Sequence, residues 1–225
     1  MAQAGIHSLI GLAVRKWTPS RTWLMLGIVL GSMLPDADNL AVAVATVMKL
    51  PTDALHRTFT HSLFLVATVI IVFFLLGRLV HQPRWTNLGI GLGVGIILHI
   101  LLDLLIWFNG VSFLWPIPSW ISLWDRFTPP VWFDKLNLSA EFLFIAFFFI
   151  GLDALARRSK TDPDYLGMLR IWTWVEVVLF VIFTVLVFVM QKGFMTPYGG
   201  IYLLSLALAI GVSIRMRSTI EALAA

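Results

Sequence analysis

Histidine and aspartate side chains recur inside apolar segments in the first half of this chain. In the stretch ILHILLDLL, His99 and Asp103 stand four residues apart and share one face of a helix. His99 lies near the middle of an apolar run, about 15 Å from either end at 1.5 Å per residue. An ionisable pair at that depth costs a few kcal/mol per charge, unless it faces a cavity or a partner. The pair suits two ligands of one metal ion or a histidine oriented by a carboxylate, and the alternative is a hydrogen bond that joins two helices.

Two further carboxylates, Asp36 and Asp38, follow Pro35 in the segment GSMLPDADN. Proline cannot continue a helix, so a loop is expected here. In an extended loop, residues two apart point to the same side. Two carboxylates that face one way repel each other unless a cation lies between them. The alternative for Asp38 alone is an N-cap of a helix that begins at Asn39.

A third polar cluster, LHRTFTHSLF, lies at the edge of a long apolar run. Arg57 and His61 share a face if a helix has already begun there, whereas His56 is expected to precede the helix. The alternative is a polar belt that solvates a helix start at the membrane interface. His7 lies in the short apolar segment GIHSLIG. A lone histidine in such a segment usually has a structural role, and His7 becomes a candidate ligand only because the other three clusters exist.

Carboxylates and imidazoles without thiolates are the ligand types that suit Zn²⁺, Mn²⁺ or Fe²⁺. Six such side chains are enough for one or two divalent metal ions, with zinc or manganese as the leading candidates. The candidate metal ligands are His7, Asp36, Asp38, His61, His99 and Asp103.

The composition is that of an integral membrane protein. Hydrophobic residues make up 59% of the chain and charged residues 12%, with a mean hydropathy of +0.90, whereas soluble domains carry about 25% charged residues. The net charge of +4 is spread over short loops, which indicates membrane topology and argues against nucleic-acid binding. There is no cysteine, which excludes disulfides and thiolate metal sites. No basic segment or cleavage site marks the N-terminus, so no cleaved signal peptide is expected.

The hydropathy pattern predicts an all-α fold, a polytopic transmembrane bundle with about five full spans plus short N-terminal helices. Stretches near the roughly 20 residues that a span needs are Thr60–Leu79, Leu88–Phe108, Leu138–Leu155, Ile171–Met190 and Gly199–Ile214. Three shorter pieces, expected as short or re-entrant helices, are Ile6–Val14, Trp23–Leu34 and Asn39–Leu50. Residues 1–118 would hold the candidate site, and residues 119–225 would hold an interfacial loop and three helices of the same folded domain.

Basic residues predict the orientation, because they mark the cytoplasmic side of membrane proteins. Basic residues flank two of the loops between spans and also follow the last span. With five spans, these two loops and the C-terminal segment all lie on the same side of the membrane. The C-terminus is therefore expected in the cytoplasm and the candidate site on the outer side, although Lys49 and Arg57 then lie outside, against the rule. The basic residues in question are Arg78, Arg84, Arg157, Arg158, Lys160, Arg170, Arg215 and Arg217.

The segment from Trp107 to Phe133 holds half of the ten tryptophans. Tryptophan favours the headgroup layer, so this segment predicts an interfacial cover over the site, or an ordinary aromatic belt. The later spans contain the carboxylates Glu141 and Glu176. Glu141 is placed where it can approach the site, and Glu176 is expected to contact another helix or to be a charge at the inner interface.

In order and spacing, these segments resemble the YdjM family, the LexA-regulated, membrane-bound metal-dependent hydrolases of bacteria. The matching pieces cover about residues 5–118 and are His7, GSMLPDAD, HRTFTHS, LHILLD and GVSFLWP. The chain departs from the family pattern at Asn39 and Leu40, where members often carry histidine or proline, and after Asp103, where they tend to carry a Thr-Pro turn. The resemblance implies a bacterial plasma (inner) membrane location, a bound metal and a hydrolase activity.

The preferred hypothesis is metal-assisted hydrolysis of a phosphoester or phospholipid at the outer leaflet, with membrane lipid as the partner. Arg57 would pair with a phosphate or carboxylate, because its guanidinium binds two oxygens at once, and His56 would act as general acid or base. One alternative is a small transporter or ion-translocating protein that uses His99, Asp103 and Glu176. Another is a non-catalytic membrane protein whose metal only stabilises the fold. The oligomeric state stays open.

Overall fold

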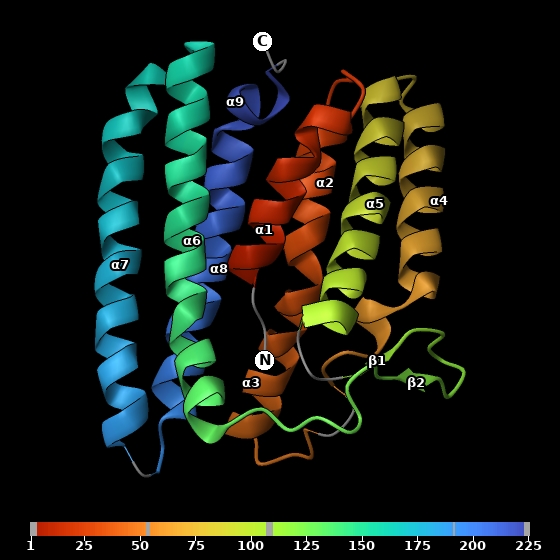
Figure 1. Cartoon of the computed structure of the whole chain (residues 1–225). Helices are drawn as coiled ribbons and strands as arrows, with labels where there is room; N and C mark the ends of the chain where they lie inside the picture. The colour runs from red at the N-terminus through yellow and green to blue at the C-terminus, as the bar shows by residue number, and fades with distance from the viewer. Residues whose placement is uncertain (1–3, 53–54, 107–109, 191, 223–225) are drawn as a thin grey trace.

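The computed structural model describes residues 4–52, 55–106, 110–190 and 192–222, and its fold is the predicted all-α bundle (Figure 1). Its α-helices are α1 (Ala4–Ala13), α2 (Leu24–Met33), α3 (Asn39–Val47), α4 (Leu63–Leu79), α5 (Pro83–Ile106), α6 (Val131–Ser159), α7 (Leu166–Val189), α8 (Met195–Arg215) and α9 (Arg217–Glu221). Short 3-10 helices are η1 (Val14–Trp17), η2 (Leu34–Asp38), η3 (Phe59–His61) and η4 (Pro163–Tyr165), and a two-stranded ribbon joins β1 (Val111–Ser112) to β2 (Trp120–Ile121).

Five helical segments of the described chain are long and apolar enough to cross a membrane, as predicted in number. Four of them contain α5, α6, α7 and α8. The predicted full span Thr60–Leu79 is not among the five, because its helix, α4, begins only at Leu63 and has 17 residues. The fifth is Leu24–Val47, a segment predicted to be two short helices separated at Pro35. Pro35 instead stands at the start of η2, where its missing N–H costs nothing, so the helix continues. Trp107 and Phe108, at the end of one predicted span, lie outside the described residues.

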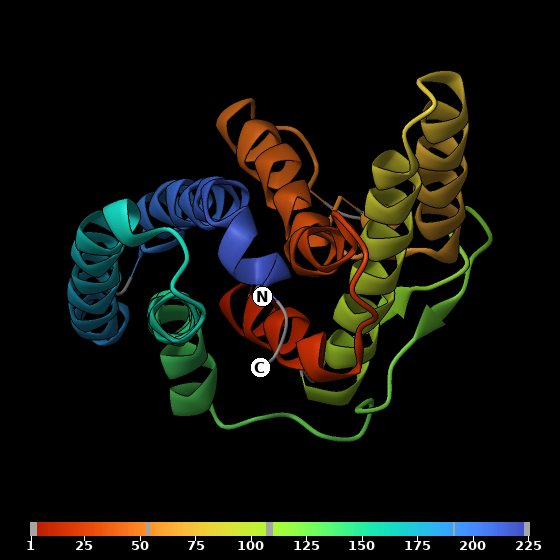
Figure 2. The same cartoon turned by 90° about the horizontal axis from the view of Figure 1, so that it is seen from above.

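Seen from above, α1 and α2 lie between two groups of helices (Figure 2). On one side α4 and α5 form an antiparallel hairpin that packs against α2, and on the other α6, α7 and α8 pack together, with α6 against α1. The main hydrophobic core contains residues of α1, α2, α6, α7 and α8. The N-terminal helices therefore hold the two groups together, and the candidate ligands lie where these helices meet α5 and the loop before α4.

Small residues bring α2 and α5 unusually close. Gly27 and Gly31 on α2 face Gly91 and Gly95 on α5, each pair spaced as in the GxxxG pattern of membrane helix interfaces. A Cβ atom at Gly31 would lie 2.2 Å from the Leu92 carbonyl oxygen. The backbones thus touch where a larger side chain would separate them, and this contact sets the position of η2 relative to the second half of α5.

The tryptophan-rich segment after α5 lies against the polar loop before α4. The Ser112 N–H donates to the Arg57 carbonyl oxygen at 2.9 Å, and the Leu63 N–H donates to the Phe113 carbonyl oxygen at 3.0 Å. The rings of Phe59 and Trp115 meet edge to face, with centroids 5.1 Å apart. The loop that carries Arg57 is therefore held from below by the β1–β2 segment (Figure 1).

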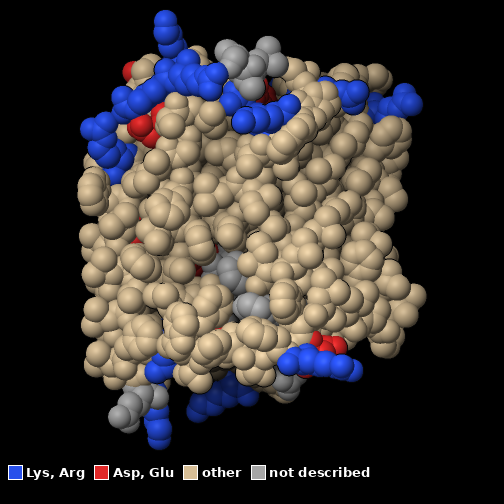
Figure 3. Space-filling model, in the orientation of Figure 1, with Lys and Arg blue, Asp and Glu red and all other residues tan. Residues whose placement is uncertain are grey.

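Lysine and arginine side chains gather at one end of the bundle (Figure 3). This end holds the α1–α2, α4–α5 and α6–α7 connections and the C-terminus of α8, which carry the basic residues of the orientation argument together with Arg15, Lys16 and Arg21. Fewer basic residues lie at the opposite end, on the face that Figure 3 shows. The distribution is polarised along the bundle axis, as in a chain that crosses a membrane with one basic side.

Candidate metal centre

All six predicted metal ligands meet at one buried point of the bundle. They come from four elements that are distant in the sequence, and no more than 9% of any of them is exposed. The contributing residues are His7 of α1, Asp36 and Asp38 of η2, His61 of η3, and His99 and Asp103 of α5. The two predicted catalytic residues, His56 and Arg57, lie beside them in the loop before η3.

His99 presents one ring nitrogen to the centre of the cluster because the other is already engaged. Its Nδ1 lies 2.8 Å from the Ser32 carbonyl oxygen, an acceptor that fixes the proton on Nδ1. Its Nε2 lies 3.0 Å from His61 Nε2 and 3.8 Å from Asp36 Oδ1. The His99 ring also stacks on the ring of His7, with centroids 3.8 Å apart and 23° between the planes. The close packing of α2 on α5 thus leaves a lone pair of His99 aimed at three other polar side chains.

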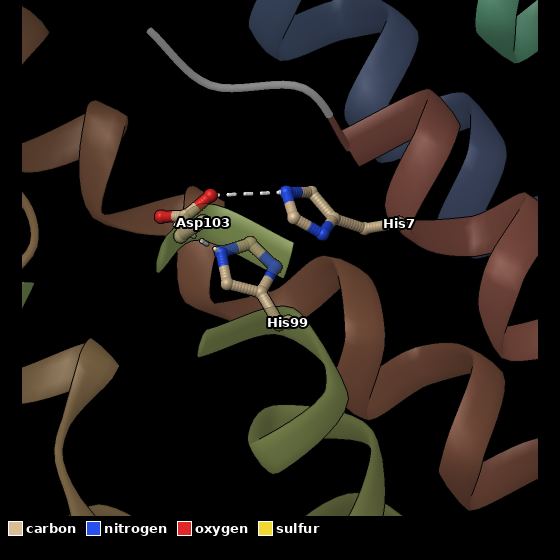
Figure 4. A group of neighbouring side chains, drawn as sticks. All are labelled: His7, His99 and Asp103. Atoms are coloured by element: carbon tan, nitrogen blue, oxygen red, sulfur yellow. Dashed lines mark ion pairs between the residues drawn. The ribbon is translucent and has the colours of Figure 1, made fainter. Parts of the chain in front are cut away.

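Asp103 lies one turn after His99 and joins the cluster through both carboxylate oxygens. Its Oδ1 is 3.3 Å from His7 Nε2, and its Oδ2 is 3.4 Å from His61 Nε2 and 3.8 Å from His99 Nε2. Figure 4 shows His7 and His99 side by side, both turned toward Asp103. The predicted shared face of His99 and Asp103 is present, and it points into the bundle rather than to lipid.

Asp38 organises the polar loop rather than capping a helix. It accepts a hydrogen bond from the Thr60 hydroxyl at 2.7 Å, and its Oδ1 lies 2.7 Å from His56 Nδ1. The Thr60 oxygen lies 2.9 Å from His61 Nδ1 and can accept its proton, which leaves His61 Nε2 free to face His99. Asp38 makes no capping hydrogen bond to α3. The η2 segment is a 3-10 helix and not the loop that was predicted. Asp36 therefore contacts His99, whereas Asp38 contacts His61.

Arg57 is 3% exposed and adopts a left-handed backbone conformation, with φ of 61°. Its Nε lies 3.4 Å from Asp103 Oδ2. The helix begins only at Leu63, where the Ser62 hydroxyl accepts a hydrogen bond from the Leu65 N–H, so Arg57 and His61 share no helical face. The loop instead brings both side chains to the same carboxylate from different directions.

The spacing of these atoms fits a transition-metal site. Nitrogen and oxygen ligands about 2.0–2.2 Å from one ion lie roughly 3–3.6 Å from each other in tetrahedral or octahedral geometry. Of the four contacts that join His61, His99, Asp36 and Asp103, two measure 3.0 and 3.4 Å and fall in this range, and the other two, at 3.8 Å each, are slightly longer. Buried Asp103 Oδ2 accepts no hydrogen bond from the described residues, although nitrogens surround it. A cation would satisfy this oxygen and both facing imidazoles.

Three overlapping groups have ligand atoms within 4.8 Å of one another. One joins His7, His99 and Asp103, and a second joins Asp36, His61 and His99. The third joins Asp38, His56 and His61, so His56 belongs to the same set, although the sequence analysis gave it only a catalytic role. Because His61 and His99 are shared, the three groups form one connected cluster rather than separate sites.

Glu141 holds the helix that carries His7. The Gly5 N–H, in the first turn of α1, points at both oxygens of the buried carboxylate, at 3.1 and 3.3 Å. A Cβ atom at Gly5 would lie 2.6 Å from the Ile145 nitrogen, so α1 rests directly on α6. The sequence placed Glu141 near the site but offered no partner, because a backbone N–H leaves no signal in the side-chain pattern. Glu176 contacts Ser205 of α8, a helix contact of the predicted kind.

The comparisons with known proteins agree with this architecture. The family model described as YdjM inner membrane protein matches residues 2–195, which include every candidate ligand. No curated protein and no solved structure matches the chain. Since the family match covers most of the sequence, and the described part has five apolar helical spans, the chain belongs to the YdjM family of inner membrane proteins.

Proposed function

We propose that this protein is a membrane-bound, metal-dependent hydrolase. The observation that carries the proposal is the convergence of histidines and carboxylates from four elements in one buried cluster of three overlapping groups, each with its ligand atoms within 4.8 Å of one another. His7, Asp36, His61, His99 and Asp103 would hold one or two divalent ions, zinc or manganese first. Asp38 would join them as a metal ligand in the group that it forms with His56 and His61, or as the carboxylate that orients His61.

The chemistry would divide between the buried cluster and its rim. A bound divalent ion supplies a water whose pKa is lowered toward neutrality. Arg57 lies beside Asp103 and would pair with an anionic oxygen of the substrate, where negative charge grows during the reaction. The His56 Nδ1 contacts Asp38, and its Nε2 is buried without a hydrogen-bond partner among the described residues, so this nitrogen would exchange a proton with a substrate that enters the cluster.

We further propose that the C-terminus is cytoplasmic and that the site opens toward the outer leaflet. The basic end of the bundle would be the inner side, and the loop with His56 and Arg57 lies at the opposite end. The β1–β2 segment beside that loop exposes large apolar side chains, including Ile117, Trp120 and Leu123. A phosphoester, such as a phospholipid headgroup, is the substrate class that fits an arginine, a metal and a lipid-facing loop together.

The experiment compares two variants in purified protein after a screen of phosphoesters and phospholipids. Arg57→Ala should keep the metal and the fold but lose turnover by about 10²–10³-fold, as when one charge-stabilising group is removed. His61→Ala should lose both metal and thermal stability, because bound metal stabilises the native state. Arg126→Ala, an exposed arginine of the same end, serves as the matched control and should keep both.

Two results would count against this division of roles. Equal loss of metal in Arg57→Ala and His61→Ala would make Arg57 part of the scaffold. A loaded, folded protein without activity across the whole screen would favour a structural metal, the non-catalytic alternative.

A further inference from the structure

A cavity of about 340 Å³ lies between α1 and α6 at the basic end of the bundle, away from the metal cluster. Leu9 and Leu12 of α1 form one wall, and Gly151, Ala154 and Leu155 of α6 form the other. Each set follows helical spacing, so the two walls are continuous stripes that face each other. From Gly151 to the end of α6 at Ser159 the groove runs for about 12 Å at 1.5 Å per residue.

The mouth of this cavity is strongly basic. Arg15 and Lys16 of η1 and Arg158 in the last turn of α6 line it, and its described lining residues include no carboxylate. Burial, and after it the charge of Arg158, lower the pKa of Arg15. The guanidinium stays charged at neutral pH, so like charges are held near each other. An anion at this position would relieve the repulsion.

Gly151 gives the groove its depth. A Cβ atom there would have one neighbour within 4 Å, the Leu12 Cδ2 atom at 3.6 Å, which is ordinary van der Waals contact. This glycine is unlike Gly5 or Gly31, where a Cβ atom would collide with backbone. The helices do not need it for close approach, and a larger side chain would simply fill the space.

We propose that this cavity binds an anionic phospholipid, with its phosphate between Arg15, Lys16 and Arg158 and an acyl chain along the stripe of Leu12 and Gly151. Basic pockets between transmembrane helices on the cytoplasmic side are typical anionic-lipid sites. A soluble phosphate compound would contact the basic mouth but not the apolar groove below it. The combination of a basic mouth and an apolar groove therefore favours a lipid as the ligand. This site is separate from the metal cluster and does not depend on its chemistry.

The test measures lipid binding to the detergent-purified full chain by native mass spectrometry and by thermal stabilisation. Phosphatidylglycerol should bind and raise the Tm, whereas phosphatidylcholine and inorganic phosphate should do neither at the same concentration. The double variant Lys16→Gln/Arg158→Gln should bind phosphatidylglycerol about thirtyfold more weakly. Each basic residue near the surface contributes about 1 kcal/mol, and about 1.4 kcal/mol corresponds to a tenfold change in affinity. Gly151→Leu should lose affinity as well, with its charges intact.

Arg157→Gln is the matched control, because Arg157 neighbours Arg158, does not line the cavity and pairs with Asp153 at 2.6 Å. It should bind phosphatidylglycerol as the natural chain does. Equal binding of phosphatidylcholine, equal stabilisation by inorganic phosphate, or unchanged affinity in both the double variant and Gly151→Leu would each overturn the proposal. Circular dichroism of every variant separates lost binding from lost fold.

Discussion

Replacing Gly31 by alanine tests how closely α2 and α5 must approach to form the metal centre. The new Cβ atom would lie 2.2 Å from the Leu92 carbonyl oxygen, whereas a normal carbon–oxygen contact is about 3.3 Å. The two helices must therefore separate locally by about 1 Å. The Ser32 carbonyl follows Gly31 directly, so its 2.8 Å contact with His99 Nδ1 would lengthen to about 3.8 Å, beyond hydrogen-bonding distance.

We expect Gly31→Ala to lower the free energy of unfolding by about 1–3 kcal/mol, as overpacked cores do, and to reduce bound metal because His99 loses its orienting acceptor. Thermal unfolding in detergent and elemental analysis measure the two effects. Gly211→Ala in α8 is the control, since a Cβ atom there has no neighbour within 4 Å. That change should leave stability equal or up to about 1 kcal/mol higher. Equal Tm and equal metal content in the two variants would refute the helix-spacing argument.

Three other predictions use different parts of the chain. Glu141→Ala should destabilise the protein by about 1–3 kcal/mol and loosen metal binding, because a buried N–H at the start of α1 loses its acceptor; an unchanged Tm would contradict this. Cysteines introduced at Ser119 and Lys160 should react oppositely with an impermeant thiol reagent on intact cells, with Ser119 labelled from outside; the reverse pattern would invert the proposed orientation. At Asp162, burial raises the pKa, but hydrogen bonds from α9 outweigh it and the net pKa is lowered. Its contribution to stability is therefore full at neutral pH and is lost progressively below about pH 5. Asp162→Asn should make stability fall less steeply between neutral and acidic pH. An equally steep fall in both proteins would argue against this role.

The candidate site was predictable because its residues are costly in a membrane. His99 and Asp103 have no reason to lie inside an apolar helix unless they face something polar, and the helical repeat puts them on one face. The same reasoning made His7 a candidate only because the other polar clusters are present in the chain. What links it is the packing of α1 on α6 through Gly5, a tertiary contact that no local pattern encodes.

Errors arose where backbone geometry depends on the neighbours. Pro35 correctly indicated the end of an α-helix, but the chain continues as a 3-10 helix, and the two flanking helices together form a candidate span. Arg57 would have shared a face with His61 only if the helix had already begun there. The helix begins at Leu63, and Arg57 lies in a left-handed conformation whose carbonyl accepts a hydrogen bond from Ser112, far along the chain. Sequence periodicity describes the face of an element and not the path of the loop that precedes it.

The most direct test of the account is the metal content of His99→Ala, Asp103→Ala and the double variant. Both side chains face the same point, so each single change should remove most of the roughly one or two equivalents of transition metal expected in the natural chain. The double variant should then lose little more than either single one. Full metal occupancy in the double variant, or a natural chain that binds no metal after loading with zinc or manganese, would contradict the metal centre.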